Sequence, residues 1–158
     1  MKKHIFLSIL LIILSVSFSY AQKDFQGFYN KHRNDAGVES FDMSTSLFRF
    51  LMKNRDTDSH ILNNISRVSL FMSDSATPGL KRSLHAHLSK NIYKDLMEIH
   101  TDHSGVSIKI RETRDGIEEL LFIADADNSL FVLSITGFMT FEEAAALAGS
   151  VDLDAYVE

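Results

Sequence analysis

The chain of 158 residues contains no cysteine, only one proline and only seven glycines. Without cysteine it can form no disulfide, no thiolate zinc site and no cysteine nucleophile, and it has no thiol to carry a lipid anchor. The sequence also contains no internal repeat and no low-complexity tract. These absences predict a domain stabilised by an ordinary hydrophobic core, and they argue against a lipoprotein.

The first 21 residues have the three parts of a secretory signal peptide. Lys2 and Lys3 form a basic start, residues 5–18 are apolar apart from serines, and Ala21 ends a cleavage site just before Gln22. A membrane-spanning helix needs about 20 apolar residues, more than this run offers. We therefore expect export to the periplasm or the medium, cleavage after Ala21, and no membrane insertion of the mature protein.

The mature chain lacks an excess of positive charge. Removal of the signal takes away two lysines and no acid, so 14 basic and 21 acidic residues remain and the formal net charge changes from −5 to −7. An acidic domain repels a phosphate backbone, because nucleic-acid binding depends on neutralising that backbone with lysine and arginine. We therefore expect no nucleic-acid partner.

The mature chain is predicted to form one α+β domain at residues 35–150, with a lead-in at residues 22–34 and an acidic tail at residues 151–158. The lead-in is expected to contain a short docking helix, because four of its larger side chains recur at helical spacing: Phe25, Phe28, Tyr29 and His32.

Two strands and two short helices are predicted in the first half of the domain. Residues 38–43 and residues 67–73 read as strands, the second because its side chains alternate and place Val68, Leu70 and Met72 on one side. Ser44 is suited to cap a helix directly after the first strand, and another short helix is expected at residues 61–65.

A long helix is predicted from Thr77 to about His100. Thr77 is suited to the N-cap, and Pro78 to the first helical position, where its missing N–H costs nothing. Apolar residues recur at spacings of three and four along the whole segment and form one stripe: Leu84, Leu88, Ile92, Leu96 and Ile99.

A three-stranded meander is predicted next, beginning with the alternating residues 106–111. A three-residue loop at residues 114–116 would place Thr113 opposite Ile117 and Arg111 opposite Glu119. We prefer this loop because a two-residue loop at residues 115–116 would oppose two glutamates across the strands.

The second turn of the meander lies within residues 125–129, and an even-length loop there creates one fully apolar face. Thr140 and Glu143 then form a capping box that opens a last helix at residues 141–148. The predicted fold is therefore a single α+β domain with an antiparallel meander of three C-terminal strands, two earlier strands, and helices packed mainly on one face of the sheet.

The other face of the meander carries an apolar patch with charges at its margin, formed by Leu121, Ile123, Leu130 and Val132. An exposed patch of this kind marks a contact surface, for a second copy of the chain or for an envelope partner. Alternatively, residues 24–34 or the last helix fold over it. We take these four residues as the candidate interaction surface and leave both alternatives open.

No pattern of residues predicts a catalytic, cofactor or metal site. His85 and His87 lie about 200° apart around a helix, so they cannot bind one ion from one face. His100, Asp102 and His103 could contribute two or three ligands, but such a cluster lacks the further ligands of a strong metal motif. No glycine-rich phosphate loop and no serine-nucleophile motif occurs.

Two functions follow as hypotheses. The first is an exported, non-catalytic module that binds a protein or another ligand in the cell envelope and needs no cofactor. The second is a small periplasmic hydrolase or metal-dependent enzyme whose site lies near His100 and His103.

The order of hydrophobic signatures resembles a known family. The chain has a strand beginning near Gly37, a strand ending at residues 70–73, a long helix ending at residues 93–97, strands closing on residues 117–121, and a last strand at residues 131–137. Over about residues 28–148 this is similar to the small exported Bacteroidota-type proteins known as domain of unknown function 4252. The resemblance implies an accessory role in envelope stress or signalling, because the family is associated with extracytoplasmic sigma-factor circuits. Many of its members resemble lipoproteins with a cysteine after the signal, where this chain has Gln22.

Overall fold

The computed structural model describes residues 23–53 and 59–150. The predicted signal peptide and the predicted acidic tail lie outside these residues. The described elements are α2 (Gln26–His32), β1 (Val38–Met43), α3 (Thr45–Met52), α4 (Ser59–Asn63), β2 (Ile65–Ser73), α5 (Pro78–Lys90), β3 (Lys94–His100), β4 (Ser104–Thr113), β5 (Gly116–Ala126), β6 (Ser129–Met139) and α6 (Phe141–Ser150).

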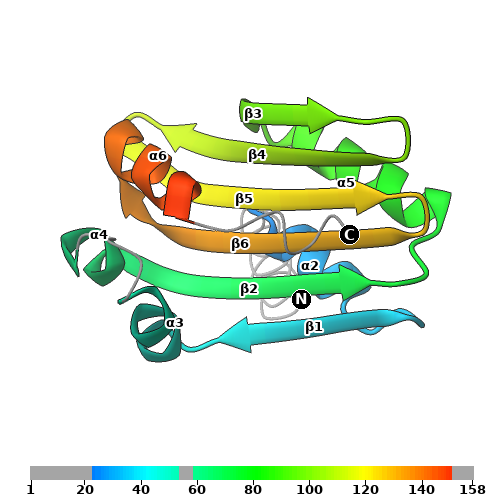
Figure 1. Cartoon of the computed structure of the whole chain (residues 1–158), viewed down its shortest axis with the longest axis horizontal. Helices are drawn as coiled ribbons and strands as arrows, with labels where there is room; N and C mark the ends of the chain where they lie inside the picture. Colours follow the sequence, from blue (N-terminus) through cyan, green and yellow to red (C-terminus); the bar gives the residue numbers. More distant parts are fainter. Residues whose placement is uncertain (1–22, 54–58, 151–158) are drawn as a thin grey trace, which may run out of the picture.

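The six strands form one antiparallel sheet in the order β1-β2-β6-β5-β4-β3 (Figure 1). The predicted α+β domain is confirmed, with the meander formed by β4, β5 and β6 and the two earlier strands by β1 and β2. The sixth strand, β3, extends the sheet beyond the meander and is its outermost strand next to β4.

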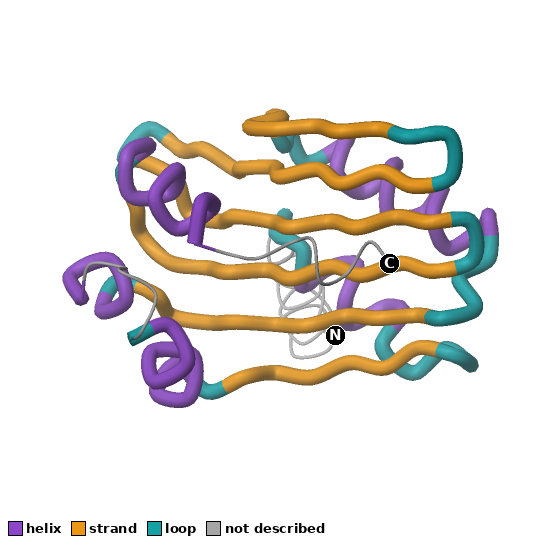
Figure 2. The backbone as a smooth tube through the Cα atoms, viewed as in Figure 1, coloured by secondary structure: helices purple, strands orange, loops and turns teal. Residues whose placement is uncertain are grey.

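Helices cover both faces of the sheet, so the prediction that they pack mainly on one face is wrong. On the front face, as drawn in Figure 1, α3, α4 and α6 cover one end of the sheet and pack on a core that includes Phe122 and Ile135. On the back face, α2 and α5 pack on a second core that includes Phe71 and Val132 (Figure 2). The physical reason is that side chains alternate along a strand, and β5 and β6 are apolar on both faces, so each face needs a cover.

The predicted helix from Thr77 to His100 is correct only in its first half, because α5 ends at Lys90 and residues 94–100 form β3. Of the predicted apolar stripe, Leu84 and Leu88 are buried, but Ile92 is 75% exposed between the two elements. The sheet outweighs the local helical pattern here, since β3 forms a backbone ladder with β4.

The way in which α5 ends explains why the sequence pattern does not reveal the end of the helix. Ile92 has a positive φ of 59°, and the N–H of Tyr93 donates to the Leu88 carbonyl at 3.3 Å, as in a Schellman motif. Glycine or asparagine usually occupies the left-handed position of that motif, whereas a β-branched residue rarely does. The chain therefore ends this helix without the usual sequence signal.

The β4–β5 hairpin has the predicted strand register but a different loop. Arg111 lies opposite Glu119, as predicted, but Thr113 pairs with Gly116 rather than with Ile117. The loop therefore contains two residues, and the extra residue forms a bulge at Glu118 in β5. Gly116 has a φ of 144°, which an L side chain rarely adopts, and it begins β5 beside this bulge.

The predicted helix caps and the β5–β6 register are confirmed, whereas the short helix predicted at residues 61–65 lies at Ser59–Asn63, because Ile65 already belongs to β2. The side-chain oxygens of Ser44 and Thr77 accept hydrogen bonds from the N–H groups of Leu47 and Leu80, as N-caps do. Thr140 and Glu143 form the capping box, with the Thr140 N–H donating to Glu143 at 2.8 Å. The β5–β6 register is the one that creates the apolar front face.

Candidate functional site

The four residues predicted as an interaction surface are interior core. Leu121, Ile123, Leu130 and Val132 are at most 7% exposed, and they belong to the core beneath α2 and α5. The lead-in segment that the sequence offered as a cover is α2, and α5 covers the same face beside it. Of the two alternatives the covered face is the one observed, and the assignment of these four residues to an interaction surface is corrected: the chain's own helices cover the apolar back face.

A buried carboxylate connects α2 to the sheet. Glu119 on β5 is 0% exposed. It accepts hydrogen bonds from Ser134 Oγ at 2.6 Å, from the Tyr93 hydroxyl at 2.5 Å and from the Phe25 N–H at 3.3 Å. Arg111 Nε lies 3.5 Å from the same carboxylate and provides its nearest positive charge. The cluster thus links β4, β5, β6, the end of α5 and the start of α2.

Burial has the largest effect on the pKa values of Glu119 and Tyr93 in this cluster. Removal from water raises the pKa of Glu119, although its hydrogen bonds from Ser134 and Tyr93 act in the opposite direction. Burial and the neighbouring Glu119 raise the pKa of Tyr93, which remains a neutral donor. Glu119 does not line either of the two described depressions in the surface, so we assign it a structural role.

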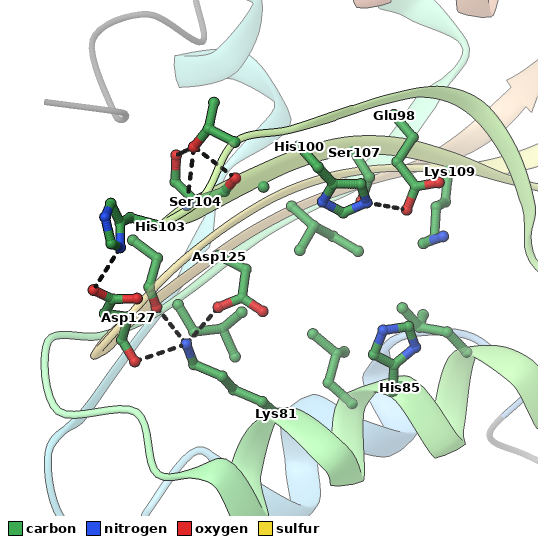
Figure 3. A pocket seen from close by; sticks show the side chains of 17 residues that line it. Lys81, His85, Glu98, His100, His103, Ser104, Ser107, Lys109, Asp125 and Asp127 are labelled. Carbon is green, nitrogen blue, oxygen red and sulfur yellow. Dashed lines mark hydrogen bonds and ion pairs between the residues drawn. The ribbon is translucent and has the colours of Figure 1, made fainter.

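A cleft lies between α5 and the β3–β4 hairpin, on the back face of the sheet (Figure 3). Its volume is about 330 Å³. It forms because α5 packs through Leu84 and Leu88 on residues of β5 and β6, and a gap remains between the helix and the β3–β4 hairpin. The cleft is therefore a gap between one helix and the outer part of the sheet.

The floor of the cleft is apolar. Leu84 and Leu88 contribute from α5, and Ile123 and Leu130 from β5 and β6. All four are buried. Two residues of the predicted interaction surface, Ile123 and Leu130, are thus part of a small recess rather than of a flat contact surface.

The rim of the cleft contains a lysine whose donors are already used. Lys81 lies 2.5 Å from Asp125 and donates to the backbone carbonyls of Ala126 and Asp127. An ammonium group has three N–H donors, and these three acceptors occupy them. Lys81 therefore fixes α5 to the β5–β6 turn and has no donor left for a ligand.

A second set of donors is available to a ligand. Lys109 donates to Asp95 only, among the acceptors in the described chain, and so keeps two N–H groups. Neither the Ser107 hydroxyl nor the His85 ring has a hydrogen-bond or ion-pair partner among the residues that the structure describes. Figure 3 shows His85 rising from α5 toward the wall formed by Lys109 and His100.

The histidines considered as metal ligands line the same cleft but contact separate carboxylates. His100 Nε2 lies 2.8 Å from Glu98, and His103 Nδ1 lies 3.6 Å from Asp127. Asp102 does not line the cleft. Within residues 23–53 and 59–150, no three histidine or carboxylate side chains are grouped so that they could hold a metal ion.

Sequence reasoning did not identify Ser107, Lys109 and His85 as one site. Alternation along β4 places Ser107 and Lys109 on the same face as Ile123, and this could be read from the sequence. The position of α5 across that face could not, because no local pattern shows where a helix lies relative to a sheet.

The comparisons with known proteins identify a family and no activity. Residues 29–147 match the family model described as Domain of unknown function (DUF4252). No curated protein and no solved structure matches the chain. None of the helices in the described part of the chain is both long enough and apolar enough to span a bilayer.

Proposed function

Because the chain belongs to the DUF4252 family, whose description assigns no activity, we propose a function from the cleft: the protein is a non-catalytic module that binds a small ligand between α5 and the β3–β4 hairpin. The observation that carries this proposal is a recess of about 330 Å³ with an apolar floor and unpaired polar groups above it. Small-molecule sites typically have this construction and about this size.

The contacts of the histidines favour binding over the alternative enzyme near His100 and His103. A hydrolase needs a nucleophile within hydrogen-bond reach of its base. Among the residues that the structure describes, neither of these histidine rings is hydrogen-bonded to a hydroxyl group, and the nearby Ser104 hydroxyl is hydrogen-bonded to Thr101 at 2.8 Å. A protein partner would need a surface other than the buried patch, and large exposed apolar side chains do occur elsewhere, on α3 and on β3.

Ligand binding can be tested by blocking the cleft. We expect ligand-observed NMR with a library of small amphipathic fragments to find binders, and methyl signals of Leu84 and Leu88 to shift when they bind. Ser107→Phe should abolish this binding because its ring fills the recess. Ser89→Phe is the matched control, since Ser89 is exposed on α5 and does not line the cleft.

Two outcomes would contradict the proposal. Fragments that bind equally well to Ser107→Phe would place the site elsewhere. Turnover of an activated ester that is lost in both His100→Ala and His103→Ala, or is made dependent on added zinc, would favour the alternative enzyme.

We further propose that the module acts outside the cytoplasm, as its N-terminal residues predict. The mature protein purified from its native host is expected to begin at Gln22 and to carry no lipid, because the chain has no cysteine. Intact-mass measurement tests this directly. A species that retains Met1, or one with the added mass of acyl chains, would contradict export by this route.

A further inference from the structure

We infer that the ligand of the cleft is a carboxylate with a short apolar chain, its carboxylate bound by Lys109, Ser107 and His85 and its chain lying on the leucine and isoleucine floor. This inference rests on the proposed function and adds the chemical class of the ligand.

The apolar floor of the cleft indicates that part of the ligand is apolar. Leu84, Leu88, Ile123 and Leu130 are buried side chains that present no polar atoms to the recess. A volume of about 330 Å³ has room for roughly ten non-hydrogen atoms, at about 30 Å³ for each atom the size of a water molecule. A short acyl chain fits both this volume and the apolar floor.

The hydrogen-bond donors of Lys109, Ser107 and His85 indicate that the polar part of the ligand is an acceptor. The Lys109 side chain is only 14% exposed, and a charge pair that is partly shielded from water is stronger than one on an open surface. Ser107 lies two residues before it on the same face of β4, and His85 approaches from α5 across the cleft. Two oxygens of a carboxylate could accept from donors on both walls at once.

The acids that line the cleft are each in contact with a basic side chain. Asp125 is paired with Lys81, and Glu98 and Asp127 contact His100 and His103. The acid that accepts from Lys109 is Asp95, which lies outside the lining of the cleft and is half exposed to water. Each acid of the lining thus already contacts a basic side chain, although its carboxylate can accept further hydrogen bonds.

Three probes with the same apolar chain separate the possible ligands: octanoate, 1-octanol and octylamine. In titrations of the mature protein followed by NMR, we expect octanoate to bind at least tenfold more tightly than octanol, because a hydrogen bond to a charged group is worth about that factor. Lys109→Met should remove about tenfold of the octanoate affinity and leave octanol unchanged.

Lys94→Met is the matched control. Lys94 also lies in the outer strands and forms an ion pair across them, with Glu112, but it does not line the cleft. It should leave the affinity for both probes unchanged. If Lys109→Met fails to fold, Ser107→Ala supplies the test through a smaller loss of octanoate affinity, about threefold, since it removes one neutral donor.

The outcomes distinguish this inference from the function on which it rests. Equal affinity for octanoate and octanol would overturn the carboxylate while leaving a ligand-binding cleft. Tighter binding of octylamine would overturn it in favour of a cationic ligand. Failure of all three probes, together with a fragment library that yields no binder, would overturn both.

Discussion

Replacing Glu119 by alanine is expected to lower the free energy of unfolding by about 3–5 kcal/mol, the usual loss when one partner of a buried charged cluster is removed. The carboxylate is inaccessible to solvent, and it accepts hydrogen bonds from Tyr93, Ser134 and the Phe25 N–H. Alanine would leave these donors buried without an acceptor, and it would leave Arg111 without its closest buried partner. The start of α2 should loosen first, because Phe25 is attached to the sheet through this carboxylate.

Chemical denaturation of the variant measures this loss, and Glu118→Ala is the matched control. Glu118 is the neighbouring residue on β5, and its carboxylate lies 3.0 Å from the same arginine but is partly exposed. An exposed ion pair of this kind contributes only about 0–1 kcal/mol. Similar losses in the two variants would show that the buried cluster does not stabilise the fold as its contacts indicate.

The same cluster gives the stability a specific pH dependence. Because the pKa of Glu119 is higher in the folded chain than its ordinary value of 4.5, protonation of this group favours the folded state. Its contribution is fully present below that ordinary value and is lost as the pH rises through the raised pKa. Stability measured against pH should therefore fall less steeply above the ordinary value in Glu119→Gln than in the wild type, since glutamine does not titrate.

Phe122→Ala is expected to cost about 3–5 kcal/mol of unfolding free energy, the range for removing a buried aromatic ring from a core. Phe122 lies at the centre of the front face, is 0% exposed, and belongs to the core formed with Leu120, Ile135 and Leu147 of α6. Its removal opens a cavity in the layer that holds α6 to the sheet, and the surrounding strands cannot relax to fill it.

The matched control for this ring is Phe50→Ala. Phe50 is a phenylalanine on α3 that is 73% exposed, so its truncation removes little apolar area from contact. Its loss should stay below about 1 kcal/mol, as is usual for surface substitutions. If urea titration gave Phe122→Ala a loss as small as this, the assignment of the front core would be wrong.

Much of the sheet could be predicted from neighbouring residues in the sequence. The pairing of Arg111 with Glu119 follows from avoiding like charges across the strands, and the β5–β6 register follows from aligning apolar side chains. The caps at Ser44, Thr77 and Thr140 were equally readable, because a cap depends on residues within one helical turn. The sequence does not distinguish a bulge at Glu118 from a longer loop, because both conserve the same register.

The second half of the predicted long helix shows where local pattern misleads. Residues 94–100 continue the apolar spacing of α5, yet they form β3, because the ladder with β4 satisfies their backbone groups. The same residues therefore have an apolar spacing typical of a helix and the conformation of a strand. Pairing with β4 decides in favour of the strand. Because β3 forms part of the cleft wall, a prediction that places residues 94–100 in a helix contains no such cleft.

Whether the apolar patch is covered and where the cleft lies both depend on how the helices pack on the sheet. Side-chain alternation alone placed Leu121, Ile123, Leu130 and Val132 together on one face, and in the structure they are together. Alternation cannot show whether α2 and α5 lie over that face, because the crossing of a helix over a sheet is set by packing between residues far apart in the chain. In this fold α5 packs on residues of β5 and β6 and leaves a gap toward the β3–β4 hairpin. Residues as distant in sequence as His85 and Lys109 thereby come to face one another across one recess.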